Sequence, residues 1–201
     1  MQQLSGKAQA TRDRILEAAN ELFFQYGYHA TGLEKVIKQA EVTKGNFYYY
    51  FKSKEELAVQ TLEWHFKKTL QQTKENVLKQ RLSPIKTLFA ILEMMSVRQK
   101  EQQNNGNICG CYFGNFTLEL SAESQAVRSK VKFIFDQFLK NFQTLLEAAK
   151  AEGEIPDSID PVQASSIILS LMEGAILLDK ADQQSRHIDH NIEFIRQYLQ
   201  A

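Results

Sequence analysis

The chain is poor in the two residues that most often interrupt helices. Its 201 residues include only three prolines and nine glycines. Proline removes a backbone donor and glycine loosens the backbone, so both are unfavourable inside a helix. A fold of many short strands would need more of both at its turns. Hydrophobic residues form 43% of the chain, enough for a core in one or two domains. The composition therefore predicts an all-α protein.

Cysteine and long apolar segments are also scarce. Cys109 and Cys111 are the two cysteines, which is not the framework of a disulfide-rich secreted domain. With four scattered histidines they do not suggest a structural zinc site, and no glycine-rich nucleotide-binding loop accompanies them. The polar N-terminus lacks the apolar segment of a signal peptide. The apolar run 167–178 is shorter than a membrane span. We therefore expect a cytoplasmic protein with neither a metal nor a cofactor.

Net charge is absent too, because 24 basic residues balance 24 acidic ones. The charges are unevenly distributed, however. Residues 1–54 hold eight lysines and arginines against five acidic residues. This segment therefore has three excess positive charges, and residues 55–201 have three excess negative charges. The difference is mild, but its sign favours docking of the first segment on a polyanion such as DNA.

The first quarter of the chain has the pattern of two short helices joined by a tight turn. Thr31 and Glu34 form the pattern of a capping box, which predicts a helix N-terminus. A second helix is predicted to begin at Thr43, an N-cap residue, with Phe47 and Phe51 facing the core. Apolar residues of the first of these helices recur at helical spacing: Leu33, Val36, Ile37 and Ala40. Together the two helices predict a helix-turn-helix.

The outer face of the second helix has the side chains that a DNA-reading helix needs, with phosphate-binding groups at its ends and base-reading groups along one side. The residues expected to hold phosphates are Lys44, Tyr49, Tyr50 and Lys54. Helix N-termini at Thr31 and Thr43 would add free N–H groups. The residues expected to face bases are Gly45, Asn46 and Tyr48. Alternatively, the three tyrosines only pack against protein, but packing would not require lysines at both ends.

At these residues the segment resembles the DNA-binding domain of the TetR family of bacterial repressors. The resemblance implies a helix-turn-helix domain in residues 1–54 and a helical effector-sensing and dimerisation domain in residues 55–201. It also implies a homodimer on a palindromic DNA operator and a small-molecule effector. Glu41 departs from the family, which usually has glycine there; the turn is either strained by about 1 kcal/mol or shaped differently. The matching residues are Thr31, Ile37, Ala40, Val42, Thr43, Lys44, Gly45, Phe47, Tyr48, Tyr49, Phe51, Lys54 and Leu57.

The rest of the chain predicts further long helices. They are expected at 11–26, with Tyr26 on the inner face, at 53–79, from 84, from 111, at 123–152, from 161 and at the C-terminus, with a polar loop at 99–107. The helix that begins at Pro161 is apolar on nearly every side, which indicates burial. The last helix has a seam of apolar residues at alternating spacings of four and three, namely Ile188, Ile192, Ile195 and Leu199. In the family the last two helices form a four-helix dimer bundle, and both patterns fit it.

Cys111 stands where a helix is expected to begin, and free N–H groups there would favour its thiolate. Alternatively, both cysteines are small buried hydrophobes. Residues 110–123 and 40–42 also resemble the N-ethylmaleimide reductase repressor subgroup of the family. That resemblance implies modification of Cys111 by an electrophile or oxidant, with no such role for Cys109. A further hypothesis brings Lys180 to Cys111, where it would lower the pKa of the thiol or trap its oxidised form; otherwise Lys180 reaches water.

Three functions follow from these patterns. The first is a DNA-binding repressor released when Cys111 is modified. The second is a regulator of the same fold with silent cysteines and a noncovalent hydrophobic effector bound between aromatic-rich helices. The third is a thiol-dependent redox enzyme, which we disfavour because no base or resolving motif accompanies Cys111. We therefore predict a regulator that is not an enzyme.

Overall fold

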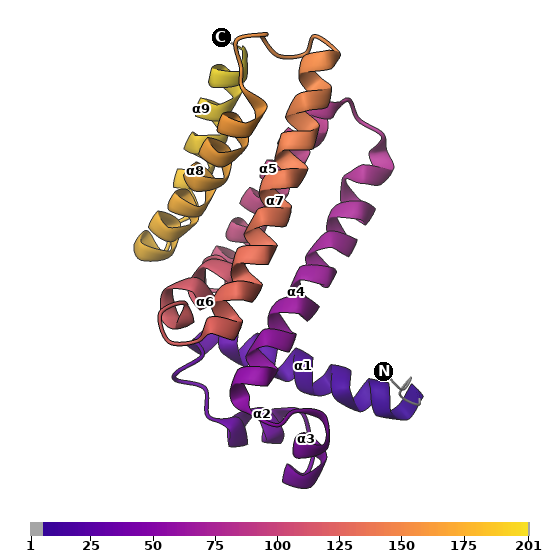
Figure 1. The fold of residues 1–201 in the computed structure, drawn as a ribbon. Coiled ribbons are helices and arrows are strands. Elements are labelled where there is room, and N and C mark those ends of the chain that lie inside the picture. The colour runs from indigo at the N-terminus through magenta and orange to yellow at the C-terminus, as the bar shows by residue number, and fades with distance from the viewer. Residues whose placement is uncertain (1–5, 201) are drawn as a thin grey trace. The chain divides into compact units, whose positions relative to one another are not determined.

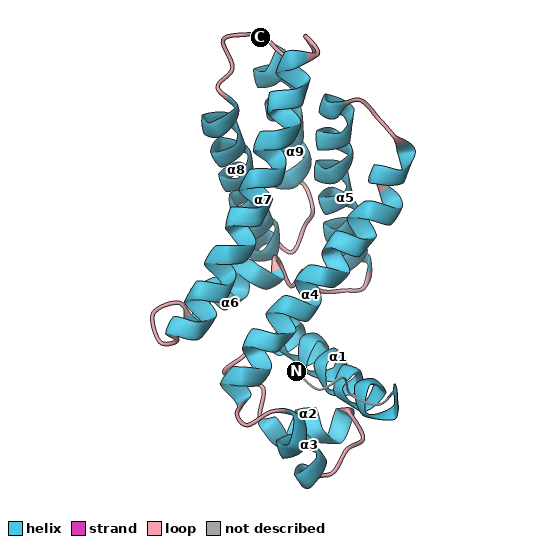
Figure 2. Ribbon diagram, turned by 45° about the vertical axis from the view of Figure 1, so that its right-hand side comes forward, coloured by secondary structure: helices cyan, strands magenta, loops and turns pink. Residues whose placement is uncertain are grey.

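The computed structural model describes residues 6–200, and within that range the chain folds into helices without a strand (Figures 1 and 2). The all-α prediction is confirmed. The elements are α1 (Gly6–Tyr26), α2 (Leu33–Gln39), α3 (Lys44–Tyr50), α4 (Lys54–Asn76), a 3-10 turn η1 (Leu78–Gln80), α5 (Pro84–Asn104), α6 (Tyr112–Leu120), α7 (Gln125–Ala151), α8 (Pro161–Asp182) and α9 (His187–Gln200).

By packing, the chain divides into two compact units. The first contains the residues up to Lys68 together with Tyr112–Lys132, and the second contains Thr69–Cys111 together with the residues from Phe133 onward. Helices α4 and α7 each begin in the first unit and continue into the second. These units do not coincide with the domain boundary predicted after residue 54, which stays a prediction.

The first unit is built on α1, α2 and α3, with α2 packed against both of the others. Helix α1 begins at Gly6 rather than near Thr11, and it ends before Gly27, which has the φ of 83° expected for a helix-ending glycine. The prediction that Tyr26 faces inward is wrong, since its side chain is 49% exposed. The Lys35 ammonium instead lies over the Tyr26 ring, 3.5 Å from its centroid. This is a cation–π contact, which can form at the surface.

The second unit has a core shared by α5, the later part of α7, α8 and α9. The predicted seam of α9 is fully used there, because Ile188, Ile192, Ile195 and Leu199 are all buried in this core. The seam of α9 therefore packs within the chain, against α8 and α5, rather than against a second subunit. Helix α5 continues to Asn104, so the loop predicted to begin at residue 99 is shorter than expected.

Helix α8 as a whole is long and apolar enough to cross a membrane by length and composition alone, whereas the sequence prediction considered only the run 167–178 within it. Its packing is that of a core helix. Ala164, Ile168 and Met172 have no exposed surface, and the helix lies alongside α9 (Figure 1). Its buried Asp179 accepts bonds from the backbone N–H groups of Arg186, at 3.0 Å, and His187, at 2.7 Å, and so caps α9.

Candidate DNA-binding and effector-sensing sites

The turn between α2 and α3 contains a residue in the left-handed region. Glu41 has a φ of 52°, and its N–H bonds the carbonyl of Lys38 at 3.1 Å. The next residue, Val42, donates to the carbonyl of Ile37 at 3.2 Å. A non-glycine residue in this conformation costs about 1 kcal/mol. Of the two alternatives predicted for Glu41, the strained turn is therefore the one observed.

Helix α3 is fixed by a cap at its start and by two aromatic side chains on its inner face. The backbone N–H of Asn46 donates to the Thr43 hydroxyl at 3.1 Å, which confirms Thr43 as the N-cap. Phe47 and Phe51 are fully buried, and their ring centroids lie 5.7 Å apart. A rigid inner face of this kind holds the outer face of a short helix in one orientation.

The outer face of α3 is open. Lys44, Gly45 and Asn46 are exposed, and Tyr48 and Tyr49 are 46% and 73% exposed. Exposed aromatic and basic groups side by side suit a partner with phosphates and flat bases. The half-buried Tyr50 packs its ring edge-on against Tyr49, with centroids 4.9 Å apart. The DNA contacts of these residues stay a prediction, but the structure leaves their side chains accessible.

The fold itself does not require glycine at position 45. A Cβ built on Gly45 would meet, among the described residues, the Thr43 hydroxyl oxygen at 3.9 Å, an ordinary contact distance. A glycine inside a helix costs about 1 kcal/mol relative to alanine. No contact among the described residues accounts for this cost, whereas the predicted close approach of a DNA backbone would account for it.

Thr31 does not form the predicted capping box. The N-cap of α2 is Gly32, which makes no side-chain cap bond. Thr31 is completely buried, and its hydroxyl donates to the carbonyls of Gly27, at 2.7 Å, and Leu22, at 3.2 Å. The reason is that a helix end leaves unpaired carbonyls and a buried hydroxyl needs an acceptor. Thr31 therefore ties the end of α1 to the start of α2, and phosphate binding by the free N–H groups at this helix N-terminus stays a prediction.

Lys54 lies partly inside the first unit. Its ammonium donates to the backbone carbonyl of Tyr28 at 2.6 Å and lies 4.0 Å from the centroid of the Tyr28 ring. Burial lowers the pKa of Lys54, and the charge of Glu119 partly opposes that shift. An ammonium has three donors, so this bond leaves capacity for a phosphate. The contact of Lys54 with DNA stays a prediction. Within the first unit, Lys54 holds Tyr28.

Sequence reasoning missed Glu119, which positions the turn before α2. Its carboxylate accepts bonds from the backbone N–H groups of Tyr28, at 3.2 Å, and His29, at 3.0 Å. A Cβ on Gly27 would lie only 2.9 Å from a carboxylate oxygen of Glu119. Because some 90 residues separate the partners, no local pattern could have predicted this contact. Gly27 was identified only as a helix end.

Cys109 and Cys111 are partly buried residues of the second unit, and neither forms a disulfide within the described residues. The backbone that leads to Cys111 is held by two glutamine side chains. Gln102 of α5 accepts from the N–H groups of Cys109, at 2.7 Å, and Gly110, at 3.2 Å. Gln183, which follows α8, accepts from the N–H of Ile108 at 2.8 Å and donates to its carbonyl at 3.1 Å. We call residues 108–111 the cysteine loop. Helix α6 begins directly after it, as predicted.

The two cysteines have different charged neighbours. Lys180 acts on Cys109: burial raises the pKa of that thiol, and the Lys180 charge partly lowers it. Cys111 has an acidic partner, Glu173 of α8. Burial raises the pKa of Glu173, and a hydrogen bond between its side chain and that of Cys111 partly lowers it. The approach of Lys180 to Cys111 stays a prediction, and the Glu173 partnership was not foreseen.

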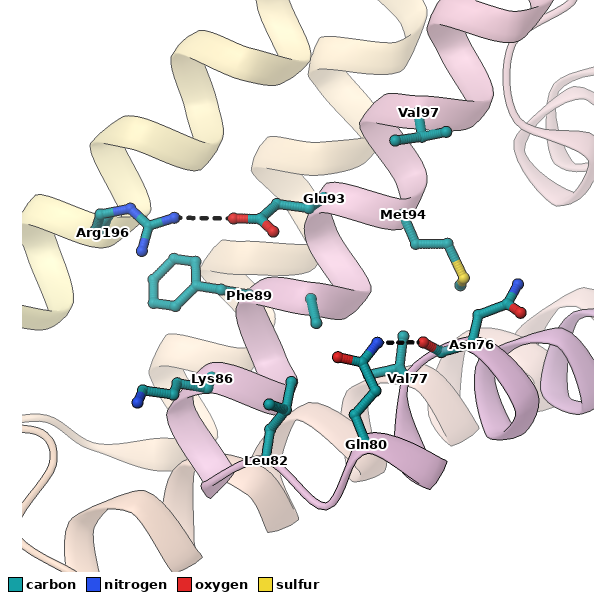
Figure 3. A pocket seen from close by; sticks show the side chains of 11 residues that line it. Asn76, Val77, Gln80, Leu82, Lys86, Phe89, Glu93, Met94, Val97 and Arg196 are labelled. Carbon is teal, nitrogen blue, oxygen red and sulfur yellow. Dashed lines mark hydrogen bonds and ion pairs between the residues drawn. The ribbon is translucent and has the colours of Figure 1, made fainter.

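A cleft of about 520 Å³ lies at another place in the second unit (Figure 3). Its walls come from the end of α4, η1, α5 and α9. The Arg196 guanidinium lies 4.2 Å from the centroid of the Phe89 ring and bonds Glu93 at 3.1 Å. Val77 and Met94 add apolar surface. A largely apolar cleft with a few polar groups suits a small amphipathic ligand.

Within residues 6–200, no group of three or more histidine, cysteine, aspartate or glutamate side chains could hold a metal ion. His187 instead bonds the carboxylate of Asp182 at 2.8 Å.

Comparison with protein families agrees with this geometry. Residues 15–61, which include the helix-turn-helix, match the family described as bacterial regulatory proteins, tetR family. Residues 84–195 match the tetracyclin repressor-like C-terminal domain. The chain belongs to the TetR family.

Individual TetR-family proteins are similar along almost the whole chain. The HTH-type transcriptional repressor DhaR of Mycobacterium sp. (strain GP1) is 28% identical over 192 residues, which cover 94% of this chain and 91% of DhaR. The HTH-type transcriptional repressor NemR of Escherichia coli (strain K12) is 26% identical over 193 residues, which cover 94% of each protein. The crystal structure of E. coli NemR in its reduced form has a TM-score of 0.84 and covers 94% of this chain and 96% of that one.

These similarities confirm the fold and the functional class predicted from sequence. The family and the relatives named above are regulators of transcription, so the prediction of a regulator rather than a thiol enzyme is confirmed. The predicted likeness to the NemR subgroup is also confirmed at the level of similarity.

Proposed function

We propose that this TetR-family chain is a cytoplasmic repressor that binds a palindromic operator as a homodimer. The observation that carries the proposal is the exposed face of α3, where basic and aromatic side chains stand on two fully buried phenylalanines. Two such helices enter successive major grooves about 34 Å apart. Lys44 and Tyr49 contact phosphates, and Asn46 and Tyr48 reach base edges.

The dimer uses the surfaces of α8 and α9 that the core of the second unit leaves open. Large apolar side chains of these helices are exposed, namely Val162, Ile167, Leu177, Leu178 and Phe194. Between them on α8 stand exposed small residues, Ser166, Ser170 and Gly174, which permit close approach of another helix. An apolar patch of this kind marks a protein interface.

Release from DNA follows modification of Cys111 by an electrophile or oxidant. Modification favours a state of the dimer in which the two α3 helices no longer match the grooves. To empty an operator, the modified protein must prefer that state by several kcal/mol. The cleft beside Phe89 favours a second candidate, in which a noncovalent amphipathic ligand produces the same shift while both cysteines stay silent.

A DNA-binding measurement tests the proposal. The purified chain is titrated onto a fluorescent fragment of the region upstream of its own gene, over a range of salt concentrations. We expect salt-sensitive binding of one dimer per site and release on addition of N-ethylmaleimide. A protein that stays monomeric and shows no salt-sensitive binding to any duplex would contradict the proposed repressor function. A Cys111→Ser protein that is still released by the natural inducer would favour the noncovalent candidate.

A further inference from the structure

The cysteine loop of the second unit is held by more side-chain hydrogen bonds than a cysteine that only packs in a core requires. Gln102 and Gln183 satisfy the backbone N–H groups of Ile108, Cys109 and Gly110, which keeps the backbone in one conformation. Gly110 has a φ of 88°, a conformation that favours glycine. The position of Cys111 is therefore preorganised, as the nucleophile of a reaction requires.

A partly buried acid lies beside this thiol. Glu173 lies on α8, whose neighbouring residues Met172, Ala175 and Ile176 are buried and apolar. A carboxyl group placed among such residues needs a polar partner, and the Cys111 side chain supplies one through a hydrogen bond. The pair joins a nucleophile to an acceptor for its proton, the arrangement by which thiols are activated.

A half-buried cation completes the cluster. Arg98 of α5 is half-buried, and its charge interacts with both Cys111 and Glu101. A positive charge near Cys111 stabilises the negative charge that develops on sulfur. On the same helix, Gln99 precedes Gln102 by one turn, and its buried amide oxygen has no partner among the described residues. This oxygen is an acceptor on the side of α5 that holds the loop.

We propose that Glu173 is the proton acceptor of Cys111 when this thiol adds to an α,β-unsaturated carbonyl compound, and that Arg98 stabilises the sulfur charge. The inference rests on the proposed sensing role of Cys111 and names its chemistry. The S–H proton passes to the Glu173 carboxylate while sulfur bonds the β-carbon. The electron pair of the C=C bond moves toward the carbonyl as an enolate. The α-carbon then takes the proton from Glu173, which leaves a thioether and an ionised carboxylate.

Electrostatics alone would give the opposite result, which makes the proposal testable. Removing the negative charge of Glu173 would lower the pKa of Cys111, because a neighbouring anion disfavours a thiolate. A carboxylate that acts only through its charge therefore slows the thiol, and its removal accelerates labelling. A carboxylate that accepts the proton speeds the thiol, and its removal slows labelling below the pKa of the thiol.

The experiment uses the full chain with Cys109→Ser, so that Cys111 is the single thiol. Labelling by N-ethylmaleimide is followed by intact mass between about pH 5.5 and 8.5, a range that lies below or at the ordinary pKa of a cysteine thiol. We expect Glu173→Gln to slow labelling at least about tenfold near pH 6. The rate of this variant should then rise tenfold per pH unit, while the parent depends less steeply on pH.

Two further variants keep the result interpretable. Glu101→Gln makes the same chemical change at another acid that interacts with Arg98, and it should leave labelling within about twofold of the parent. Glu173→Asp retains a carboxylate and should recover part of the rate. Labelling of the Gln variant as fast as the parent, or faster, near pH 6 would overturn the proposal, and so would an unreactive Cys111 in the parent. DNA binding by the same samples, measured before labelling, tests the repressor independently.

Discussion

The face of α3 and the cysteine loop are positioned in different ways. The α3 face depends on neighbours in sequence: Thr43 caps the helix three residues before its partner Asn46, and Phe47 and Phe51 are four residues apart. The cysteine loop depends on a glutamine that lies 75 residues away, Gln183. A surface that reads a duplex can be specified locally. A sensing thiol needs walls from several helices, because its reactivity depends on what surrounds it.

The largest effect is expected from the inner face of α3. Phe47→Ala removes a fully buried ring and should lower the free energy of unfolding by about 3–5 kcal/mol. Tyr49→Ala, on the exposed face, is the matched control and should change it by less than about 0.5 kcal/mol. Denaturant unfolding, followed by far-UV circular dichroism, measures both. Equal losses would mean that the two faces of α3 are not distinct.

The next effect separates base readout from phosphate binding on α3. Asn46→Ala should weaken binding to the operator by about 1–3 kcal/mol and leave the salt dependence unchanged. Lys44→Ala should weaken binding to all duplexes and reduce the salt slope by about one unit. Fluorescence anisotropy at several salt concentrations distinguishes the two. An Asn46→Ala protein with an altered salt slope would assign that residue to phosphate instead.

A comparable effect is expected at Glu119, the contact of the first unit that is remote in sequence. Glu119→Ala leaves the N–H groups of Tyr28 and His29 without their acceptor and should lower stability by about 1–3 kcal/mol. DNA affinity should fall with it, since this turn leads into α2. Glu123→Ala, which removes an exposed ion pair with His29 at 3.6 Å, should change stability by less than about 1 kcal/mol. Equal losses of stability in the two variants would contradict the positioning role of Glu119.

A smaller effect of opposite sign is expected at Gly45. Gly45→Ala should stabilise the free protein by about 0.5–1 kcal/mol, because alanine loses less entropy in a helix and the added methyl group has room. The same change should weaken binding to DNA. Thermal unfolding and anisotropy of one preparation measure both quantities. A variant that is both more stable and equally tight on DNA would show that no backbone approaches Gly45.

The smallest effect is a dependence on pH. Hydrogen bonds from Lys67 and Lys130 lower the pKa of Glu63. A lowered pKa in the folded state adds stability above the unfolded pKa, and this stability is lost as pH falls through the folded value. Because Glu63 is 46% exposed, Glu63→Gln should cost only about 0.5 kcal/mol at neutral pH. The difference from the parent should vanish once the pH has fallen below the folded pKa of Glu63. A constant difference across this pH range would exclude the ionised state as its cause.

Local sequence patterns predicted most of the fold and the α3 site. The start of α8 at Pro161, the cap at Thr43 and the end of α1 at Gly27 depend on single residues and their neighbours, and the structure has all three. The predictions that Thr31 caps α2 and that Tyr26 faces inward failed because local patterns do not fix tertiary contacts. A threonine before a helix can cap it or bond a carbonyl behind it, and only the position of α1 decided which bond formed.

By itself, the sequence determined the fold class, the helix-turn-helix and the chemistry of its outer face, because helical spacing, caps and turns act over a few residues. Only the tertiary structure placed Glu119 on the turn before α2, Glu173 at Cys111 and Lys180 near Cys109. Those pairings join residues that lie tens of positions apart, and packing rather than local preference brings such residues together.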